Sequence, residues 1–204
     1  MTIEQIMRTS PVIPVITLDG TIDPVALAET YVANGLRVIE VTLRTPQGLD
    51  AIRAMSAVEG AIVGAGTVLN EKQLDQAIEA GSKFIVSPGL TEPLGRAAVD
   101  RGIPFLPGIA NAGDLMRGLD LGLDRFKFFP AEASGGRAAL KAISAPFGNV
   151  RFCPTGGITP ETASDWLALD SVLCIGGSWL LKTGETDLAA IGARARAAAA
   201  LRQG

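Results

Sequence analysis

Phe126-Lys127-Phe128-Phe129-Pro130-Ala131-Glu132 is a short aromatic strand pattern that stops at a proline, and an amine is the one hydrophilic group inside the aromatic run. Burial disfavours the charged form of a lysine amine. The neutral amine is a nucleophile that can condense with a carbonyl group to give a Schiff base. This stretch therefore predicts a buried strand that carries a candidate catalytic residue, Lys127.

Seven other short runs rich in valine and isoleucine occur along the chain, with helical stretches between them, which is typical of parallel βα units. Eight units predict an α/β protein built as a closed (β/α)8 TIM barrel, with a short N-terminal helix and a C-terminal helix. No linker or shift in composition divides the sequence, so residues 1–204 are expected to form a single domain. The eight runs lie near residues 12–16, 37–42, 61–64, 84–87, 104–107, 125–129, 150–154 and 172–175.

Helix boundaries are predicted from capping residues and prolines. Asp23-Pro24, Thr45-Pro46 and Thr159-Pro160 each pair a capping side chain with a proline suited to the first helical position. Gly35 is expected to end the first of these helices. Residues 187–201 are rich in alanine and arginine, which predicts a terminal helix whose arginines lie on a solvated face.

The composition excludes several classes of function. The 204 residues include no histidine, so a Ser-His-Asp triad and a histidine metal ligand are ruled out, and no metal site is expected. The net charge of −3, without a basic stripe, argues against a nucleic-acid partner. Cys153 and Cys174 lie in separate apolar segments and are expected to be free thiols. Without a membrane-length apolar run or a signal-peptide pattern, the protein is expected to be cytoplasmic with no membrane partner.

A carboxylate lies in the middle of another predicted strand, Val38-Ile39-Glu40-Val41-Thr42-Leu43-Arg44. Strand side chains alternate between two faces, so Glu40, Thr42 and Arg44 share the face that a barrel would turn inward. Lys127 would face the same interior, where two opposite charges can offset each other's desolvation. Such a pair is typical of a structural ion pair and of a catalytic couple, and both interpretations stay open. Arg44 stands at the strand's outlet, where it could clamp a carboxylate or form an ion pair at the rim.

Glycine pairs follow the last two predicted strands. Gly156-Gly157 comes after the seventh strand, and Gly176-Gly177-Ser178 comes after the eighth, with the serine expected to open the next helix. Backbone N–H groups at these two loops of a barrel, together with a helix N-terminus, commonly receive phosphate. Each glycine taken alone is also explained by a tight turn. Their occurrence in neighbouring loops favours a phosphate site.

Five motifs follow one another between Pro11 and Trp179: EVTLRT at 40–45, GAGTVL at 64–69, SPGL at 87–90, KFFPAE at 127–132 and RFCPTGGI at 151–158. In identity, order and separation they resemble those of the 2-keto-3-deoxy-6-phosphogluconate (KDPG) and 4-hydroxy-2-oxoglutarate (KHG) aldolases. The resemblance implies a homotrimeric class I aldolase on a (β/α)8 barrel. It would cleave KDPG to pyruvate and D-glyceraldehyde 3-phosphate, the last step of the Entner-Doudoroff pathway.

The resemblance also implies a role for individual residues. Lys127 would form the Schiff base and Glu40 would transfer protons, with a phosphorylated 2-keto acid as the partner and no cofactor beyond the covalent imine. The remaining implied residues fall into two groups. The pyruvate half would be held by Arg44, Thr67, Pro88 and Phe129, and the phosphate by Thr155, Gly156, Gly157, Gly177 and Ser178.

One segment departs from the family pattern. Ala110-Asn111 replaces the small hydroxyl residues that the family leads us to expect after Gly108-Ile109, although Asn111 can still cap a helix. The substrate could therefore also be the phosphogalactonate-derived epimer or 4-hydroxy-2-oxoglutarate. Two further alternatives keep the phosphate site: a sugar-phosphate isomerase or epimerase, and a non-catalytic barrel that binds a phosphorylated ligand.

Overall fold

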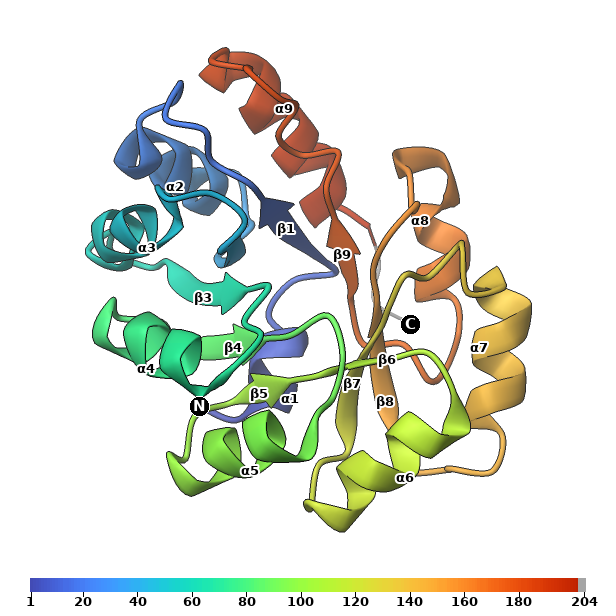
Figure 1. Ribbon diagram of the computed structural model, residues 1–204. Coiled ribbons are helices and arrows are strands. Elements are labelled where there is room, and N and C mark those ends of the chain that lie inside the picture. The colour runs from blue at the N-terminus through green and yellow to red at the C-terminus, as the bar shows by residue number, and fades with distance from the viewer. Residues whose placement is uncertain (202–204) are drawn as a thin grey trace.

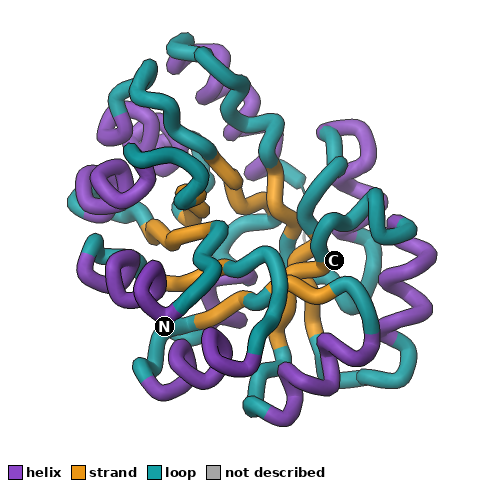
Figure 2. The backbone as a smooth tube through the Cα atoms, in the orientation of Figure 1, coloured by secondary structure: helices purple, strands orange, loops and turns teal. Residues whose placement is uncertain are grey.

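The computed structural model describes residues 1–201, so residues 202–204 of the predicted domain lie outside the described part. Parallel strands lie at the centre, and the longer helices surround them (Figures 1 and 2). The strands are β1 (Val12–Ile16), β2 (Val38–Thr42), β3 (Ile62–Gly66), β4 (Phe84–Val86), β5 (Phe105–Leu106), β6 (Gly108–Ile109), β7 (Arg125–Phe128), β8 (Arg151–Pro154) and β9 (Ile175–Gly177). The helices are α1 (Ile3–Met7), α2 (Pro24–Ala33), α3 (Gly48–Ser56), α4 (Glu71–Glu79), α5 (Glu92–Asp100), α6 (Ala112–Asp120), α7 (Gly136–Ser144), α8 (Pro160–Leu167) and α9 (Leu188–Ala199).

The strands form two parallel ladders. One has the order β5-β4-β3-β2-β1-β9 and the other has the order β6-β7-β8. Two isolated parallel bridges, Phe152 with Val172 and Thr155 with Gly176, connect β8 to the chain that leads into and through β9. The predicted α/β class is confirmed as a curled parallel sheet with helices on its outer side (Figure 1).

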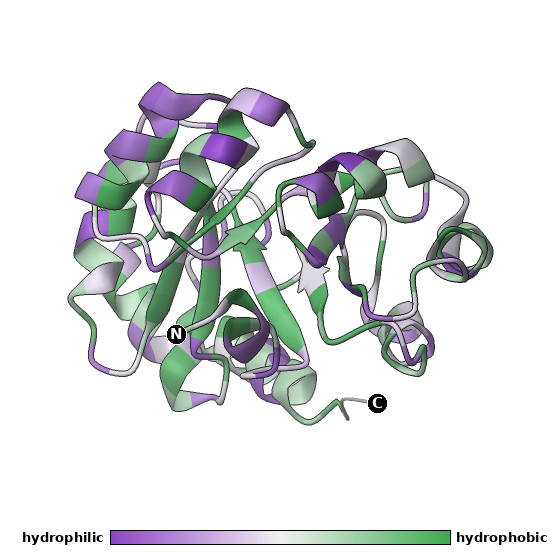
Figure 3. Ribbon diagram, turned by 90° about the horizontal axis from the view of Figure 1, so that it is seen from below, coloured by the Kyte–Doolittle hydropathy of each residue, from purple (hydrophilic) through white to green (hydrophobic). Residues whose placement is uncertain are grey.

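Alternation along the strands separates two apolar clusters. Ile39 and Val41 of β2 pack in the larger cluster, between the sheet and the surrounding helices. Val38 belongs to the smaller cluster, inside the curl of the sheet, together with Ile6 and Met7 of α1. Because that cluster draws on residues near the amino ends of several strands, α1 covers that end of the sheet. Strands buried on both faces are mostly hydrophobic, whereas the surrounding helices carry hydrophilic stretches (Figure 3).

The fifth predicted run, residues 104–107, contains only β5, and a second short strand, β6, follows directly after it. Proline has no N–H to donate to a ladder, and Pro107 separates β5 from β6. The Pro107 carbonyl still accepts a hydrogen bond from the Lys127 N–H at 2.8 Å. A side chain at Gly108 would collide with the Pro88 carbonyl group, so the two chain segments approach closely there. The other predicted runs match strands within a few residues, apart from the eighth, where the strand begins only at Ile175.

Two of the three predicted helix starts, at Asp23 and Thr159, are confirmed. Asp23 accepts a hydrogen bond from the Ala26 N–H at 2.9 Å, and α2 ends just before Gly35 as expected. Thr159 is the N-cap residue of α8, with Pro160 in the first turn, and its N–H donates to the Thr162 hydroxyl group at 3.0 Å. The start at Thr45-Pro46 is wrong, because the Thr45 hydroxyl donates to the Leu18 carbonyl at 2.6 Å and α3 begins at Gly48.

The C-terminal helix α9 confirms the prediction for residues 187–201 with slightly shorter bounds, but its arginines are not all solvated. Arg194 is 23% exposed, forms an ion pair with Glu185 and donates to the Leu180 carbonyl at 3.3 Å. Arg196 is exposed and donates to Asn34 at 2.9 Å. Thus Arg194 fastens α9 to the segment that follows β9. None of the helices in residues 1–201 combines the length and the apolar character that a membrane span requires.

Candidate active site

Lys127 and Glu40 meet inside the curl of the sheet, as the alternation of β2 and β7 predicts. The Lys127 Nζ atom lies 3.1 Å from Glu40 Oε1, and each side chain is 4% exposed. In the ladders Lys127 sits between Gly108 and Cys153, and Glu40 sits between Val15 and Gly64. The sheet therefore brings together a buried amine and a buried carboxylate that are 87 residues apart in the sequence.

Two glycines of β3 leave room for side chains of the neighbouring strands, Gly66 for Glu40 and Gly64 for Phe84. A Cβ atom added at Gly66 would lie 2.7 Å from Glu40 Cγ, and one added at Gly64 would lie 2.6 Å from Cδ1 of Phe84. Both glycines lie within β3 rather than in a turn. Two glycines at alternate positions share one face of a strand, and that spacing was the available signal for a close approach from inside.

The surroundings of Lys127 are mostly apolar and aromatic. The Phe129 ring centroid lies 5.2 Å from Lys127 Nζ, within the range of a cation–π interaction. Cys153 and Cys174 are buried free thiols, as predicted. Burial, followed by the neighbouring Cys153 thiol and the Glu40 charge, raises the pKa of the Cys174 thiol. Cys174 therefore stays protonated near neutral pH.

The residues predicted to hold the pyruvate half follow the carboxyl ends of successive strands. Arg44 comes after β2, Thr67 after β3 and Pro88 after β4, so all three stand at the same edge of the sheet. Among residues 1–201 Arg44 is exposed and forms no ion pair, unlike the predicted rim alternative. Thr67 has a φ of 61°, an outlier for a β-branched residue. No hydrogen bond joins these three side chains to Lys127 within the described part of the chain.

A hydroxyl pair at the same edge was not predicted. Thr17, one residue beyond β1, and Thr42, at the end of β2, place their Oγ1 atoms 2.8 Å apart. Thr42 is fully buried and two residues after Glu40, so it points into the same interior. The sequence indicated the face of Thr42, but the pairing with Thr17 depends on the register between β1 and β2.

The predicted phosphate residues lie at the carboxyl ends of β8 and β9, but Gly176 and Gly177 belong to β9 itself rather than to the loop after it. Thr155 pairs with Gly176 in a parallel bridge, where a Cβ atom on the glycine would lie 2.8 Å from Thr155 Cγ2. Gly156 and Gly157 have φ values of 104° and 81°, the left-handed region that favours glycine. The expectation that Ser178 opens a helix is wrong, because a turn follows β9 and α9 starts only at Leu188.

Asn111 acts as the predicted helix cap. Its Oδ1 atom accepts from the Asp114 N–H at 3.0 Å, and its Nδ2 atom donates to Asp114 Oδ2 at 3.0 Å. The Ala110 N–H donates to the same carboxylate oxygen at 2.9 Å. The Asn111 amide is thus engaged at the start of α6 rather than free for a ligand.

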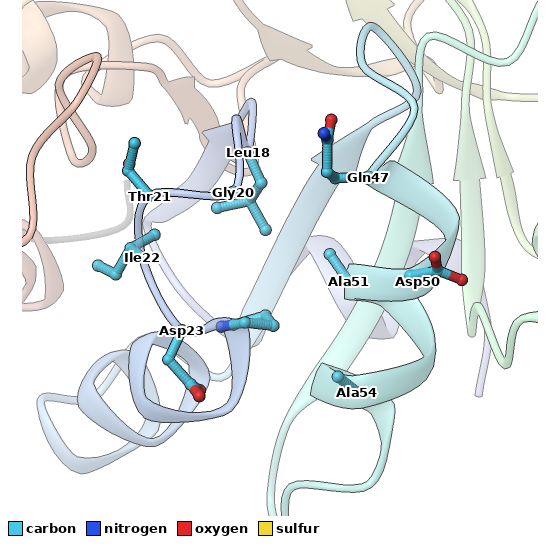
Figure 4. Close-up of a pocket in the computed structure, with 10 residues that line it drawn as sticks. Leu18, Gly20, Thr21, Ile22, Asp23, Gln47, Asp50, Ala51 and Ala54 are labelled. Atoms are coloured by element: carbon cyan, nitrogen blue, oxygen red, sulfur yellow. The ribbon is translucent and has the colours of Figure 1, made fainter.

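A hollow of about 450 Å³ lies apart from the buried lysine. It separates the loop after β1 from α3, and Figure 4 shows Leu18, Ile22 and Ala51 along its walls. Neither Lys127 nor Glu40 lines it. The chemistry is therefore located by the buried pair and not by the hollow. Within residues 1–201 no group of three or more acidic or cysteine side chains is gathered as metal ligands.

Comparison with known proteins agrees with this geometry. The family model for KDPG and KHG aldolases matches residues 3–194. The chain belongs to the KDPG and KHG aldolase family. It is accordingly an aldolase, a carbon–carbon lyase, and the resemblance inferred from its five motifs is confirmed.

Several aldolases of the family are similar along most of the chain. The 2-dehydro-3-deoxy-phosphogluconate aldolase of Zymomonas mobilis is 56% identical over 98% of this chain and 97% of its own. A crystal structure of the Zymomonas mobilis enzyme has a TM-score of 0.98, covering 100% of this chain and 98% of that one. The KHG/KDPG aldolase of Escherichia coli is 58% identical over 87% of this chain and 84% of its own.

A third aldolase bears on the chemistry. The KDPG aldolase of Legionella pneumophila is 39% identical with a TM-score of 0.94, covering 98% of this chain and 99% of that one. Its crystal structure holds pyruvate captured as a covalent carbinolamine. That intermediate forms when an amine adds to the keto group.

Proposed function

We propose that this aldolase cleaves KDPG to pyruvate and D-glyceraldehyde 3-phosphate through a Schiff base on Lys127, with no other cofactor. One observation supports this most directly: a buried amine lies 3.1 Å from a buried carboxylate. The nucleophile and the group that can exchange its proton are within hydrogen-bond reach of each other, which is the geometry that acid–base catalysis requires.

The first half of the reaction forms the imine. Lys127 gives up a proton and its Nζ atom attacks the keto carbon, which gives a carbinolamine. Glu40 is the carboxylate in reach to take that proton and to return it to the hydroxyl group that leaves as water. The product is a cationic iminium, and the Phe129 ring near Nζ offers its negative face to that charge.

The second half breaks the carbon–carbon bond. A base removes the proton of the C4 hydroxyl group, the C3–C4 bond breaks, and its electron pair moves to the iminium nitrogen to give an enamine. Glu40, directly or through a water molecule, is the base on the described chain closest to this centre. Protonation of C3 and hydrolysis of the imine then release pyruvate and restore the lysine.

The two charged ends of the substrate would lie on opposite sides of the lysine. Arg44, free of any ion pair in residues 1–201, and Thr67 would bind the carboxylate, with Pro88 and Phe129 limiting the access of water. Within the same residues the N–H groups of Gly156 and Gly157 donate to no protein acceptor. These amides, with Thr155, Gly177 and Ser178, would receive the phosphate.

Borohydride trapping with pyruvate tests this proposal. Reduction fixes the imine as a stable secondary amine, and peptide mapping is expected to place one pyruvate adduct on Lys127. Lys141→Met, which removes an exposed lysine of α7, is the matched control and should leave the adduct intact. Cleavage of substrate by the wild type without an adduct on Lys127 would refute the mechanism.

The second candidate substrate is 4-hydroxy-2-oxoglutarate, because the similar Escherichia coli aldolase is named for both substrates. Specificity is a ratio of kcat/KM values. Comparing KDPG, its phosphogalactonate-derived epimer and 4-hydroxy-2-oxoglutarate in a coupled pyruvate assay ranks the three. Release of pyruvate from none of the three would contradict the proposed substrates.

We also propose that the parallel strands close into a complete (β/α)8 barrel. The bridges at Phe152 and Thr155 and the continuous chain through Pro107 support a ring of eight strand positions that closes as a barrel. We expect the aldolase to assemble as a homotrimer. Sedimentation equilibrium would check the assembly, and a monomer at the enzyme's working concentration would contradict it.

A further inference from the structure

Glu132 lies five residues after Lys127 and has no part in the steps above. The Trp166 Nε1–H group of α8 donates a hydrogen bond to Glu132 Oε1 at 2.9 Å. Trp166 is fully buried, and its ring centroid is 6.3 Å from that of Phe128. The indole is therefore a donor held in one place by the core, whereas Glu132 belongs to a loop.

The same loop runs alongside the two glycines. The Glu132 N–H donates to the Gly156 carbonyl at 3.0 Å, and the Ala131 N–H donates to the Thr155 carbonyl at 2.8 Å. A Cβ atom added at Gly157 would lie 2.8 Å from both Cβ and Cγ of Glu132. The aliphatic part of Glu132 thus packs directly on Gly157, and its backbone is bonded to Gly156.

We propose that Glu132 and Trp166 form a clamp that holds the Gly156-Gly157 loop in the shape that binds the phosphate of the substrate. This inference depends on the phosphate site in the proposed function. Two successive glycines have many conformations in a free chain, so their N–H groups bind an anion well only when the loop is held beforehand. The hydrogen bond from Trp166 fixes Glu132, and Glu132 fixes the loop. Glu132 is a positioning residue and does not touch the reacting atoms.

The bond also keeps a negative charge away from the phosphate. The stem of Glu132 lies against Gly157, so a released carboxylate could turn toward the free N–H groups and compete for them. While Oε1 accepts from Trp166, that movement is prevented. The clamp therefore acts twice, by ordering the amides and by holding their internal competitor.

Three variants test the clamp. Glu132→Ala removes the acceptor without disturbing the core, Trp166→Phe removes the donor, and Glu132→Gln keeps an acceptor oxygen for the indole. A hydrogen bond to a charged group is worth enough that we expect KM for KDPG to rise about tenfold in the first two variants. kcat should change little, because phosphate binding acts on the ground state and the transition state alike. Glu132→Gln should stay near the wild type.

The matched control is Asp165→Asn. Asp165 neighbours Trp166 on α8 and pairs with Arg137 of α7, but both partners are exposed and neither contacts the glycine loop. This variant should match the wild type in KM and kcat. Borohydride trapping with pyruvate, which carries no phosphate, should proceed at the wild-type rate in all four variants.

The results separate this inference from the function on which it rests. If Glu132→Ala and Trp166→Phe slowed pyruvate trapping by the same factor by which they raised KM for KDPG, the role of the pair would be merely structural and the clamp would be overturned. A wild-type KM in Glu132→Ala would also overturn it. If the wild type trapped no pyruvate, the aldolase mechanism would fail. Calorimetry with inorganic phosphate would then still test the clamp. We expect weaker phosphate binding in Glu132→Ala and unchanged phosphate binding in Asp165→Asn. Equal phosphate binding in all variants, or none in the wild type, would overturn the clamp.

Discussion

At the scale of single residues, the pairing of Lys127 with Glu40 determines how much stability is lost when either residue is replaced. Both side chains are almost fully buried, and each offsets the desolvation of the other. Removing one partner leaves an uncompensated charge in an interior whose remaining neighbours include Cys153 and Cys174. Removing both partners leaves no uncompensated charge in the interior. Activity and stability should therefore respond differently to single and double substitutions.

We expect Lys127→Met to abolish pyruvate trapping and to lower the free energy of unfolding by about 3–5 kcal/mol, because Glu40 loses its counter-charge. In the double variant Lys127→Met/Glu40→Leu most of that stability should return, while activity stays absent. Urea denaturation of the wild type, both single variants and the double variant measures the coupling. Additive losses would show that the two charges do not depend on each other.

Thr67 carries backbone strain where the pyruvate carboxylate is expected. Its φ of 61° costs a β-branched residue about 1–3 kcal/mol, and glycine adopts that conformation freely. We expect Thr67→Gly to be at least as stable as the wild type, since relief of strain offsets the greater entropy of an unfolded glycine. The pyruvate concentration for half-maximal trapping should rise because the hydroxyl group is lost. Thermal unfolding with the trapping titration checks both; a destabilised variant with unchanged trapping would contradict the role.

At the scale of elements, β2 and β3 supply the carboxylate and the space for it together. Glu40 and Gly66 face the same interior, and the space at Gly66 is filled by the glutamate side chain. The glycine therefore positions Glu40, the proposed catalytic acid, even though it has no functional group. Changing β3 at this point should affect catalysis through Glu40.

We expect Gly66→Ala to lower kcat by about a hundredfold, because the new methyl group would lie 2.7 Å from Glu40 Cγ and displace the carboxylate from Lys127. Combining it with Glu40→Asp, which shortens the side chain, should recover part of the loss relative to the single change. Gly148→Ala is the control, since no atom lies within 4 Å of its added Cβ. Steady-state kinetics of the four proteins measure the effect, and an unchanged kcat in Gly66→Ala would be the contrary result.

The elements also show what the sequence could predict. Runs buried on both faces are continuous and mostly apolar, so their positions were recognisable, and charged residues flanked by apolar ones indicated Glu40 and Lys127. Predictions from neighbouring residues alone failed where a side chain binds a partner that is distant in the sequence. The Thr45 hydroxyl binds a carbonyl from the loop after β1, so it does not cap α3.

Side-chain contacts between distant segments could not be predicted from the sequence pattern for the same reason. The glycines at 156–157 favoured a phosphate loop, but nothing local in the sequence joins Glu132 to Trp166, 34 residues away. The contact of Thr17 with Thr42 likewise depends on strand register. Motifs marked the residues that we propose for the chemistry, and packing across the fold determines which residues hold them in place.

At the scale of the whole molecule, α1 covers the end of the sheet that faces away from the proposed site. Ile6 and Met7 enter the interior cluster, and Glu4 joins α1 to β7 through an ion pair with Arg125 at 2.6 Å. Arg125 also donates to the Asn149 carbonyl at 3.1 Å. The strand that presents Lys127 at one end is thereby fastened to α1 at the other.

This attachment should depend on pH through Glu4. Hydrogen bonds from Arg8 and then Arg125 hold the pKa of Glu4 below its ordinary value of 4.5. A carboxyl group with a lowered folded-state pKa contributes stability above its unfolded pKa, and that contribution is lost as the pH falls through the folded value. We expect Glu4→Gln to lower the urea midpoint at pH 7, with the difference from the wild type shrinking as the pH falls below about 4.5 and Glu4 itself becomes protonated. Glu92→Gln, which breaks an exposed pair with Arg96 inside α5, is the control and should change the midpoint little. A difference between Glu4→Gln and the wild type that stayed constant down to low pH would show that α1 is held by its apolar side chains alone.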